Sequence, residues 1–290
     1  MYHSIKQLFL LAKERKVPAW RIVLETEMEQ FEASEAQVMD KLRERYAIMT
    51  RSATLALYQP QSTLGGLISG IASKQQAHSQ TEGISGRFIN SIMARALSCS
   101  EVNASMGKIC AVPTAGACGI LPAVLMGMSE KYDLSEEKIL EALLLASGVG
   151  AVVMQSATVS GAEGGCQAEC GVAAAMSAAA AVYLAGGSDD MCQASISIAL
   201  MNVLGLVCDP VAGLVQVPCA QRNASQAVNA LISADMALAG VDPVVPADEM
   251  VEAMMRVGRM LPEALRETAK GGMAASATAQ EIAKNLYNSK

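Results

Sequence analysis

Residues 161–224 decide how this chain folds: they begin GAEGGCQAECGVAAAMSAAAAVYLAGG and end ISIALMNVLGLVCDPVAGLVQVPCAQRNA. The stretch is dominated by small and apolar residues, a composition that favours helices packed closely on every side. No Lys or Arg occurs between Lys138 and Arg222, and a segment so poor in charge must be largely buried. Aromatic residues make up only 3% of the chain. We therefore predict an all-α, multi-helix protein with small-residue-rich central helices.

Three cysteines in this stretch stand beside residues that break helices. Cys166 follows two glycines, Cys208 precedes an Asp-Pro pair and Cys219 follows a proline. Gly and Pro mark helix boundaries, so each cysteine is predicted to lie at the mouth of a helix. Free N–H groups and the positive end of the helix dipole favour a thiolate there. Three such thiolates could hold an anionic iron–sulfur centre, or they could be small core residues.

The remaining cysteines are assigned to the core, where free cysteine commonly packs as a small apolar residue. They are Cys99, Cys110, Cys118, Cys170 and Cys192. Cys166 and Cys170 have the i, i+4 spacing of a zinc pair, but neither His3 nor His78 lies near a Cys-x₂-Cys pattern. The zinc interpretation is therefore weak.

A few charged residues stand out against this apolar background. Arg222 lies three residues after Cys219, about one helical turn. It could neutralise a cluster or receive a substrate carboxylate. Asp209 either caps a helix or serves a site, and Glu169 either makes a buried hydrogen bond or ion pair or serves a site.

The rest of the chain is interpreted as one domain, 1–290, with a peripheral helical layer (1–60) and a cluster-binding catalytic core (61–290). Amphipathic helices are predicted over 4–16 and 20–31, and a longer one runs from an N-cap at Ser34 to about residue 58. Further on, 86–97 is predicted as a helix, 101–105 as the loop after it, and 133–136 as a capping box that opens a long helix.

Composition excludes several classes of protein. The net charge of −6 argues against nucleic-acid binding. Eight cysteines without a recognisable signal peptide predict a reducing cytoplasm rather than a disulfide scaffold. Residues 142–162 carry no charge and could span a membrane, but they lack basic flanks and aromatic belts. We expect a buried helix there, and no membrane partner.

Three segments carry a family resemblance: GGCQAECG, GLVCDPVAGLVQVPCAQRNA and, earlier in the chain, CAVPTAGACGILPAVL. In order and separation they resemble the iron–sulfur-dependent L-serine dehydratases, most closely the α chain of the two-subunit enzymes, over essentially all 290 residues. The resemblance implies a [4Fe-4S] cluster on Cys166, Cys208 and Cys219. An open iron would act as Lewis acid in a lyase that turns L-serine into pyruvate and ammonia, in amino-acid degradation and gluconeogenesis.

The resemblance also implies a β chain, and hence a hetero-oligomer, because the Ser/His motifs and regulatory domain of that subunit are missing here. Substrate-binding candidates are polar residues of the PTAG segment and the loop before it, together with the arginine: Asn103, Ser105, Thr114, Gly116 and Arg222. The PTAG segment could instead be only a turn. The catalytic base is not identified, because both histidines are expected at the surface.

Two alternatives remain open at this level. The chain could be a hydro-lyase acting on another small hydroxy acid or amino acid. It could also be a non-catalytic iron–sulfur redox sensor or partner subunit, which would not respond to a substrate.

Overall fold

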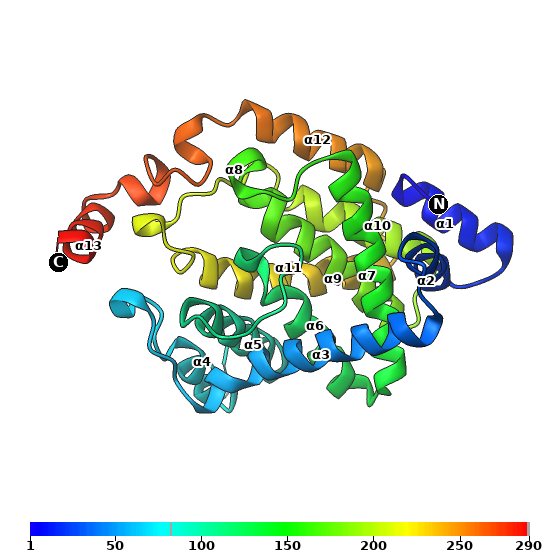
Figure 1. Ribbon diagram of the computed structural model, residues 1–290, viewed down its shortest axis with the longest axis horizontal. Helices are drawn as coiled ribbons and strands as arrows, with labels where there is room; N and C mark the ends of the chain where they lie inside the picture. The colour runs from blue at the N-terminus through cyan, green and yellow to red at the C-terminus, as the bar shows by residue number, and fades with distance from the viewer. Residues whose placement is uncertain (82, 289–290) are drawn as a thin grey trace.

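The computed structural model describes residues 1–81 and 83–288 and confirms an all-α fold (Figure 1). The helices are α1 (Ile5–Arg15), α2 (Ala19–Gln30), α3 (Glu35–Tyr58), α4 (Ile71–Ser79), α5 (Gly86–Ala104), α6 (Ile120–Tyr132), α7 (Glu136–Ser156), α8 (Gly161–Gly164), α9 (Val172–Leu184), α10 (Asp189–Met201), α11 (Cys219–Leu238), α12 (Ala247–Met260) and α13 (Ala277–Asn288). Among the described residues, a single isolated β-bridge pairs Cys208 with Arg266.

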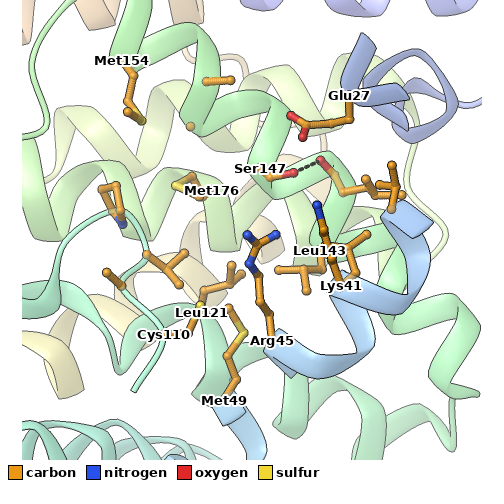
Figure 2. A pocket seen from close by; sticks show the side chains of 18 of the residues that line it. Glu27, Lys41, Arg45, Met49, Cys110, Leu121, Leu143, Ser147, Met154 and Met176 are labelled. Atoms are coloured by element: carbon orange, nitrogen blue, oxygen red, sulfur yellow. Dashed lines mark hydrogen bonds between the residues drawn. The ribbon is translucent and has the colours of Figure 1, made fainter. Parts of the chain in front are cut away.

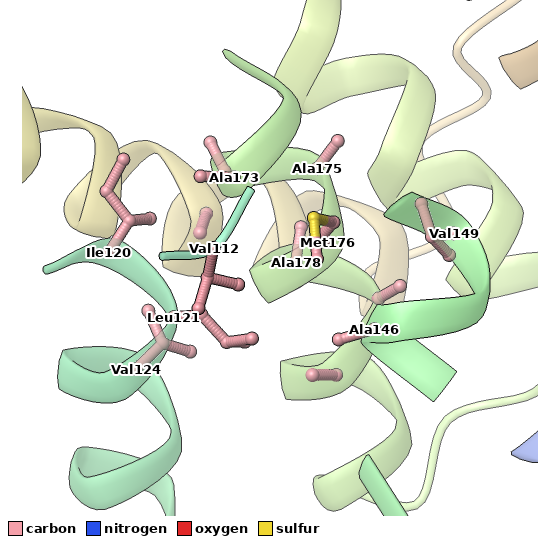
Figure 3. Packing of buried hydrophobic residues seen from close by; sticks show 14 of the residues in the cluster. Val112, Ile120, Leu121, Val124, Ala146, Val149, Ala173, Ala175, Met176 and Ala178 are labelled. Carbon is pink, nitrogen blue, oxygen red and sulfur yellow. The ribbon is translucent and has the colours of Figure 1, made fainter. Parts of the chain in front are cut away.

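Helix α9 is the centre of the fold. All of its side chains except Tyr183 are buried, and it packs against α6, α7, α10 and α11. Its alanines have the highest helix propensity and let neighbouring helices approach closely. Figure 3 shows the consequence: Ala173, Ala175 and Met176 of α9 lie between side chains of α6 and α7. A helix that is apolar on every side belongs in such a core.

Helix α7 contains most of the uncharged run of the sequence. Within the described residues it is the one helix long and apolar enough to cross a membrane, and 67% of its most apolar window is buried inside the fold. It packs against α2 and α9. This burial agrees with the expectation of a core helix.

Helices α1 and α3 begin at serine caps, and the cap at Ser34 is the predicted one. Ser4 accepts a hydrogen bond from the Gln7 amide at the start of α1. Ser34 and Gln37 form a reciprocal capping box that opens α3. The carboxylate of Asp248, in the first turn of α12, accepts hydrogen bonds from the amides of Ile5 (2.7 Å) and Lys6 (2.9 Å). The N-terminal helix is therefore fastened to a helix near the other end of the chain.

Two local predictions are wrong. Helix α5 continues to Ala104 and so includes most of the predicted loop 101–105. It continues because Glu101 is fully buried and its carboxylate accepts the amides of Gln61 (2.6 Å) and Ala72 (3.2 Å), partners that are distant in sequence. The cap of α7 is Ser135, which accepts from the Lys138 amide, whereas Asp133 adopts a left-handed conformation that ends α6.

Candidate active site

Cys166 stands at the start of a helix, as predicted. Gly165 has a positive φ of 77°, and the chain then enters a π-helical segment, Gln167–Gly171, that continues into α9. The buried amide of Gln167 fixes this turn. Its Nε2 donates to the carbonyls of Gly164 (2.9 Å) and Met254 (3.0 Å), and its Oε1 accepts from the Gly205 amide (2.8 Å).

The prediction that Cys208 stands at a helix mouth is wrong, and Asp209 caps no helix. A strap formed by residues 261–276, hereafter the C-terminal strap, holds this segment extended. The Cys208 amide donates to Leu265 O (2.9 Å), and Cys208 O accepts from the Glu267 amide (2.7 Å). Asp209 accepts from the Met273 amide (2.7 Å). Pairing with a distant segment satisfies the backbone groups that a helix would have paired locally.

Cys219 is the first residue of α11, directly after Pro218, and no side chain caps this helix. Arg222 follows one turn later, half-buried. Its guanidinium donates to Val207 O (2.7 Å) and to an Asp209 carboxylate oxygen (2.8 Å). Arg222 therefore ties the start of α11 to the residues on either side of Cys208.

The three cysteines influence one another's ionisation, so they share one region of the molecule. A hydrogen bond from the Cys170 thiol lowers the pKa of Cys166 against the effect of burial, and the nearby charge of Arg222 acts in the same direction. Burial raises the pKa of Cys219 to about 12, with the charges of Cys166 and Glu169 adding to it. Burial also raises the pKa of Cys208.

Glu169 joins the PTAG segment to Cys208. One carboxylate oxygen accepts from the Thr114 hydroxyl (2.8 Å), and the other accepts from the Cys208 thiol (3.7 Å). Burial raises the pKa of this carboxyl, and the Thr114 hydrogen bond opposes the rise. A Cβ at Gly161 would lie 2.5 Å from the Glu169 carboxylate and 3.0 Å from the Cys208 sulfur. Only a glycine leaves this space open.

Asn223 locks the PTAG segment onto α11. This fully buried amide donates to Gly116 O (2.6 Å) and Cys219 O (2.8 Å) and accepts from the Gly119 amide (2.8 Å). Sequence reasoning missed both Asn223 and Gln167, because an amide side chain gives no local signal of partners far along the chain.

Of the other predicted pocket residues, some lie against the Glu169 carboxylate and others do not. Thr114 and Gly116 lie against the Glu169 carboxylate. Asn103 donates to Ala115 O (3.3 Å), whereas the Ser105 hydroxyl bonds back to its own helix at Val102 O (2.9 Å). Both histidines are exposed, as expected: His3 near Gln155 and His78 in α4.

The remaining cysteines behave as core residues, with one exception. Those buried are Cys99, Cys118, Cys170 and Cys192. The Cys192 thiol donates to Ala179 O (3.6 Å), which is typical of a packed thiol. Cys110 is only partly buried.

The three thiols differ from the donors of a single metal ion. Among the described residues, no three His, Cys, Asp or Glu side chains are close enough to share a single metal ion. A multi-iron cluster makes a different demand, because each thiolate binds a separate iron. Three thiols from three segments, with Arg222 beside them to balance negative charge, fit that demand.

The chain is similar to known proteins along most of its length. Residues 14–274 match the family described as serine dehydratase alpha chain. The L-serine dehydratase alpha chain of Peptoniphilus asaccharolyticus is 46% identical over 287 residues, 99% of this chain and 98% of that protein. The probable L-serine dehydratase alpha chain of Bacillus subtilis (strain 168) is 41% identical over 288 residues, 99% of this chain and 96% of that protein. L-serine dehydratase 2 of Escherichia coli (strain K12) is 43% identical over 182 residues, 62% of this chain and 40% of that protein.

Proposed function

Because this chain belongs to the serine dehydratase alpha chain family, we propose that it is the alpha chain of an iron–sulfur-dependent L-serine dehydratase in the reducing cytoplasm. The reaction removes the α-proton and the hydroxyl of L-serine as water. The resulting aminoacrylate tautomerises and is hydrolysed to pyruvate and ammonia.

One observation carries the proposal: Cys166, Cys208 and Cys219 come from separate segments and converge beside Arg222. These three thiolates would hold a [4Fe-4S] cluster. The chemistry that such a cluster supplies when bound with one iron free of protein ligands is Lewis acidity toward a substrate oxygen, which helps a poor leaving group depart.

Arg222 fits a positioning role better than direct contact with the substrate carboxylate. Two of its nitrogens already donate to Val207 O and Asp209, so its charge is fixed beside Cys166. A fixed positive charge compensates the negative charge of thiolates in a buried site. The Thr114 hydroxyl and the Glu169 carboxylate then form the polar wall nearest Cys208, where a zwitterionic substrate needs partners for its charged groups.

A partner β chain would complete the site. General-base catalysis needs a group of suitable pKa within reach of the α-proton, and both histidines of this chain lie exposed, His3 at the N-terminus and His78 in α4. We therefore propose that the alpha chain supplies the cluster and part of the pocket, and that the β chain supplies the missing group.

The test is anaerobic purification of this chain alone and together with its β chain, followed by addition of L-serine, with D-serine as control. We expect L-serine to change the visible absorption of the cluster, and pyruvate to form only when both chains are present. Turnover by this chain alone would refute the need for a partner. A cluster indifferent to serine, without pyruvate, would favour a redox sensor. Failure to bind any cluster would mean that the three cysteines are core residues and not ligands.

A further inference from the structure

The structure contains a cavity that none of the three cysteines lines. It measures about 450 Å³, within the range of about 300–1,000 Å³ that is usual for small-molecule sites. Helices α2, α3 and α7 form its sides, with Leu121 and Met176 deeper in the fold (Figure 2). Neither Thr114 nor any of the three cysteines proposed for the cluster lines it. It is therefore distinct from the proposed active site.

The wall of this cavity is mainly apolar. Leucine and methionine side chains from four helices and the loop residues Ala111, Val112 and Pro113 surround its interior. Two small residues, Gly150 and Ala151, line the α7 side of the cavity. A Cβ at Gly150 would come within 2.9 Å of the Met176 methyl carbon, so a larger side chain there would reduce the space. Such a surface takes an apolar group of a ligand and releases the water that covers it.

Three charged side chains line the same cavity. Lys41 and Arg45 project from α3, and Glu27 projects from α2 on the other side of the cavity (Figure 2). Across residues 1–81 and 83–288, neither Lys41 nor Arg45 has a side-chain hydrogen bond or an ion pair, although the charge of Arg45 lowers the pKa of Glu27 against a larger rise caused by burial. The positive groups of Lys41 and Arg45 and the carboxyl group of Glu27 therefore line the cavity without forming an ion pair with one another.

We propose that this cavity binds a small zwitterion with an apolar side chain, such as an apolar α-amino acid. Arg45 and Lys41 would receive its carboxylate, and Glu27 its ammonium group. The apolar side chain would lie against Leu121 and Met176. A guanidinium fork suits a carboxylate because it can donate two parallel hydrogen bonds.

Serine does not suit this cavity, because its hydroxymethyl group would lie on apolar wall and lose its hydrogen bonds with water. The site would therefore discriminate by side chain against the proposed substrate of the enzyme. Its occupancy would also reach the active-site loop, because residues 110–113 of the wall lead directly into Thr114.

Isothermal titration calorimetry of the full-length chain with L-leucine tests the proposal. We expect saturable binding, and binding at least tenfold weaker for 4-methylpentanoate, which lacks the ammonium group, for 3-methylbutylamine, which lacks the carboxylate, and for L-serine. Loss of one charge-assisted hydrogen bond commonly weakens binding by about tenfold or more.

Variants locate the site. Arg45→Met and Glu27→Gln are each expected to weaken leucine binding at least tenfold, and Ala151→Met should abolish it by filling the cavity. Arg51→Met is the matched control, because Arg51 is exposed on the same helix and does not line the cavity; its affinity should be unchanged. Hydrogen exchange should slow at residues 110–114 when leucine is bound.

Three results would overturn the proposal. One is the absence of saturable leucine binding at millimolar concentrations. Another is equal affinity for leucine and 4-methylpentanoate, which would leave a simple carboxylate site without a role for Glu27. The third is unchanged binding in both Arg45→Met and Ala151→Met, which would place the ligand elsewhere.

Discussion

At the scale of single residues, the three candidate cluster ligands differ from other buried cysteines in what surrounds them. Cys166 has Cys170 and Arg222 beside it. The Cys208 thiol donates to the Glu169 carboxylate, whereas the Cys192 thiol donates to a backbone carbonyl. We predict that Cys→Ser at positions 166, 208 or 219 abolishes the visible absorption of the anaerobically reconstituted cluster. Cys192→Ser should retain it. Measured iron and sulfide content checks the result, and a cluster that survives Cys208→Ser would remove that residue from the ligand set.

Asn223 is a second residue whose effect can be measured. Replacing it with Ala leaves the Gly119 amide and the Gly116 carbonyl without this partner in a buried setting, and each unsatisfied group costs about 1–3 kcal/mol. We expect the free energy of unfolding to fall by about 2–4 kcal/mol, with activity lost because the PTAG segment is released. Ser225→Ala, at an exposed position of the same helix, is the control. Equal stability of the two variants in urea denaturation would contradict the proposed lock.

Residues of the site were predictable from sequence when local pattern marked them. The local pattern singled out cysteines beside glycine or proline and an arginine one turn after Cys219, and the family resemblance made three of these cysteines ligand candidates. Gln167 and Asn223 could not, because their value lies in contacts with residues such as Met254 and Gly119. The ligand roles of the cysteines stay predictions.

At the scale of elements, helices were predicted well where apolar periodicity is clear, as in α1 to α3. The errors fall where tertiary partners replace local ones. Glu101 prolongs α5 because its carboxylate is satisfied by distant amides. Cys208 lies in an extended segment because the C-terminal strap pairs with it. An Asp-Pro pair usually marks a helix start, so the sequence around Cys208 carried a local signal that the strap overrides.

The C-terminal strap gives an element-scale prediction at Gly272. This residue has a φ of +58°, and a Cβ there would collide with the Asp209 carboxylate. Gly272→Ala should therefore displace Asp209 and free Arg222, in addition to a backbone cost of about 1 kcal/mol. Gly240→Ala is the control, since Gly240 also has a positive φ but nothing lies within 4 Å of the added carbon.

Both glycine variants should unfold slightly more easily, but only Gly272→Ala should lose its cluster faster when a chelator is added. The measurement is the rate at which visible absorption decays. If both variants lose the cluster at the rate of the unmodified chain, the strap does not hold the Cys208 segment in the way its hydrogen bonds suggest.

At the scale of the whole molecule, the core and the proposed cluster site depend on different interactions. Apolar packing around α9 involves α6, α7, α10 and α11, and it does not need the thiols to be ligated. The site instead joins loops and helix ends from residues 114, 166, 208 and 219, held by a limited set of polar contacts. Regions with few buried apolar contacts open at lower free energy than the core.

Removal of the cluster should therefore loosen one part of the molecule and leave the other unchanged. Binding to the folded form stabilises the segments that supply the ligands. We expect amide hydrogen exchange in the cluster-free protein to speed up by tenfold or more at residues 206–219 and in the C-terminal strap, a change of about 1.4 kcal/mol in local opening. Exchange in α7 and α9 should change little. Equally faster exchange across α9 would contradict this prediction. It would mean that the alanine-rich core is not stable without the cluster.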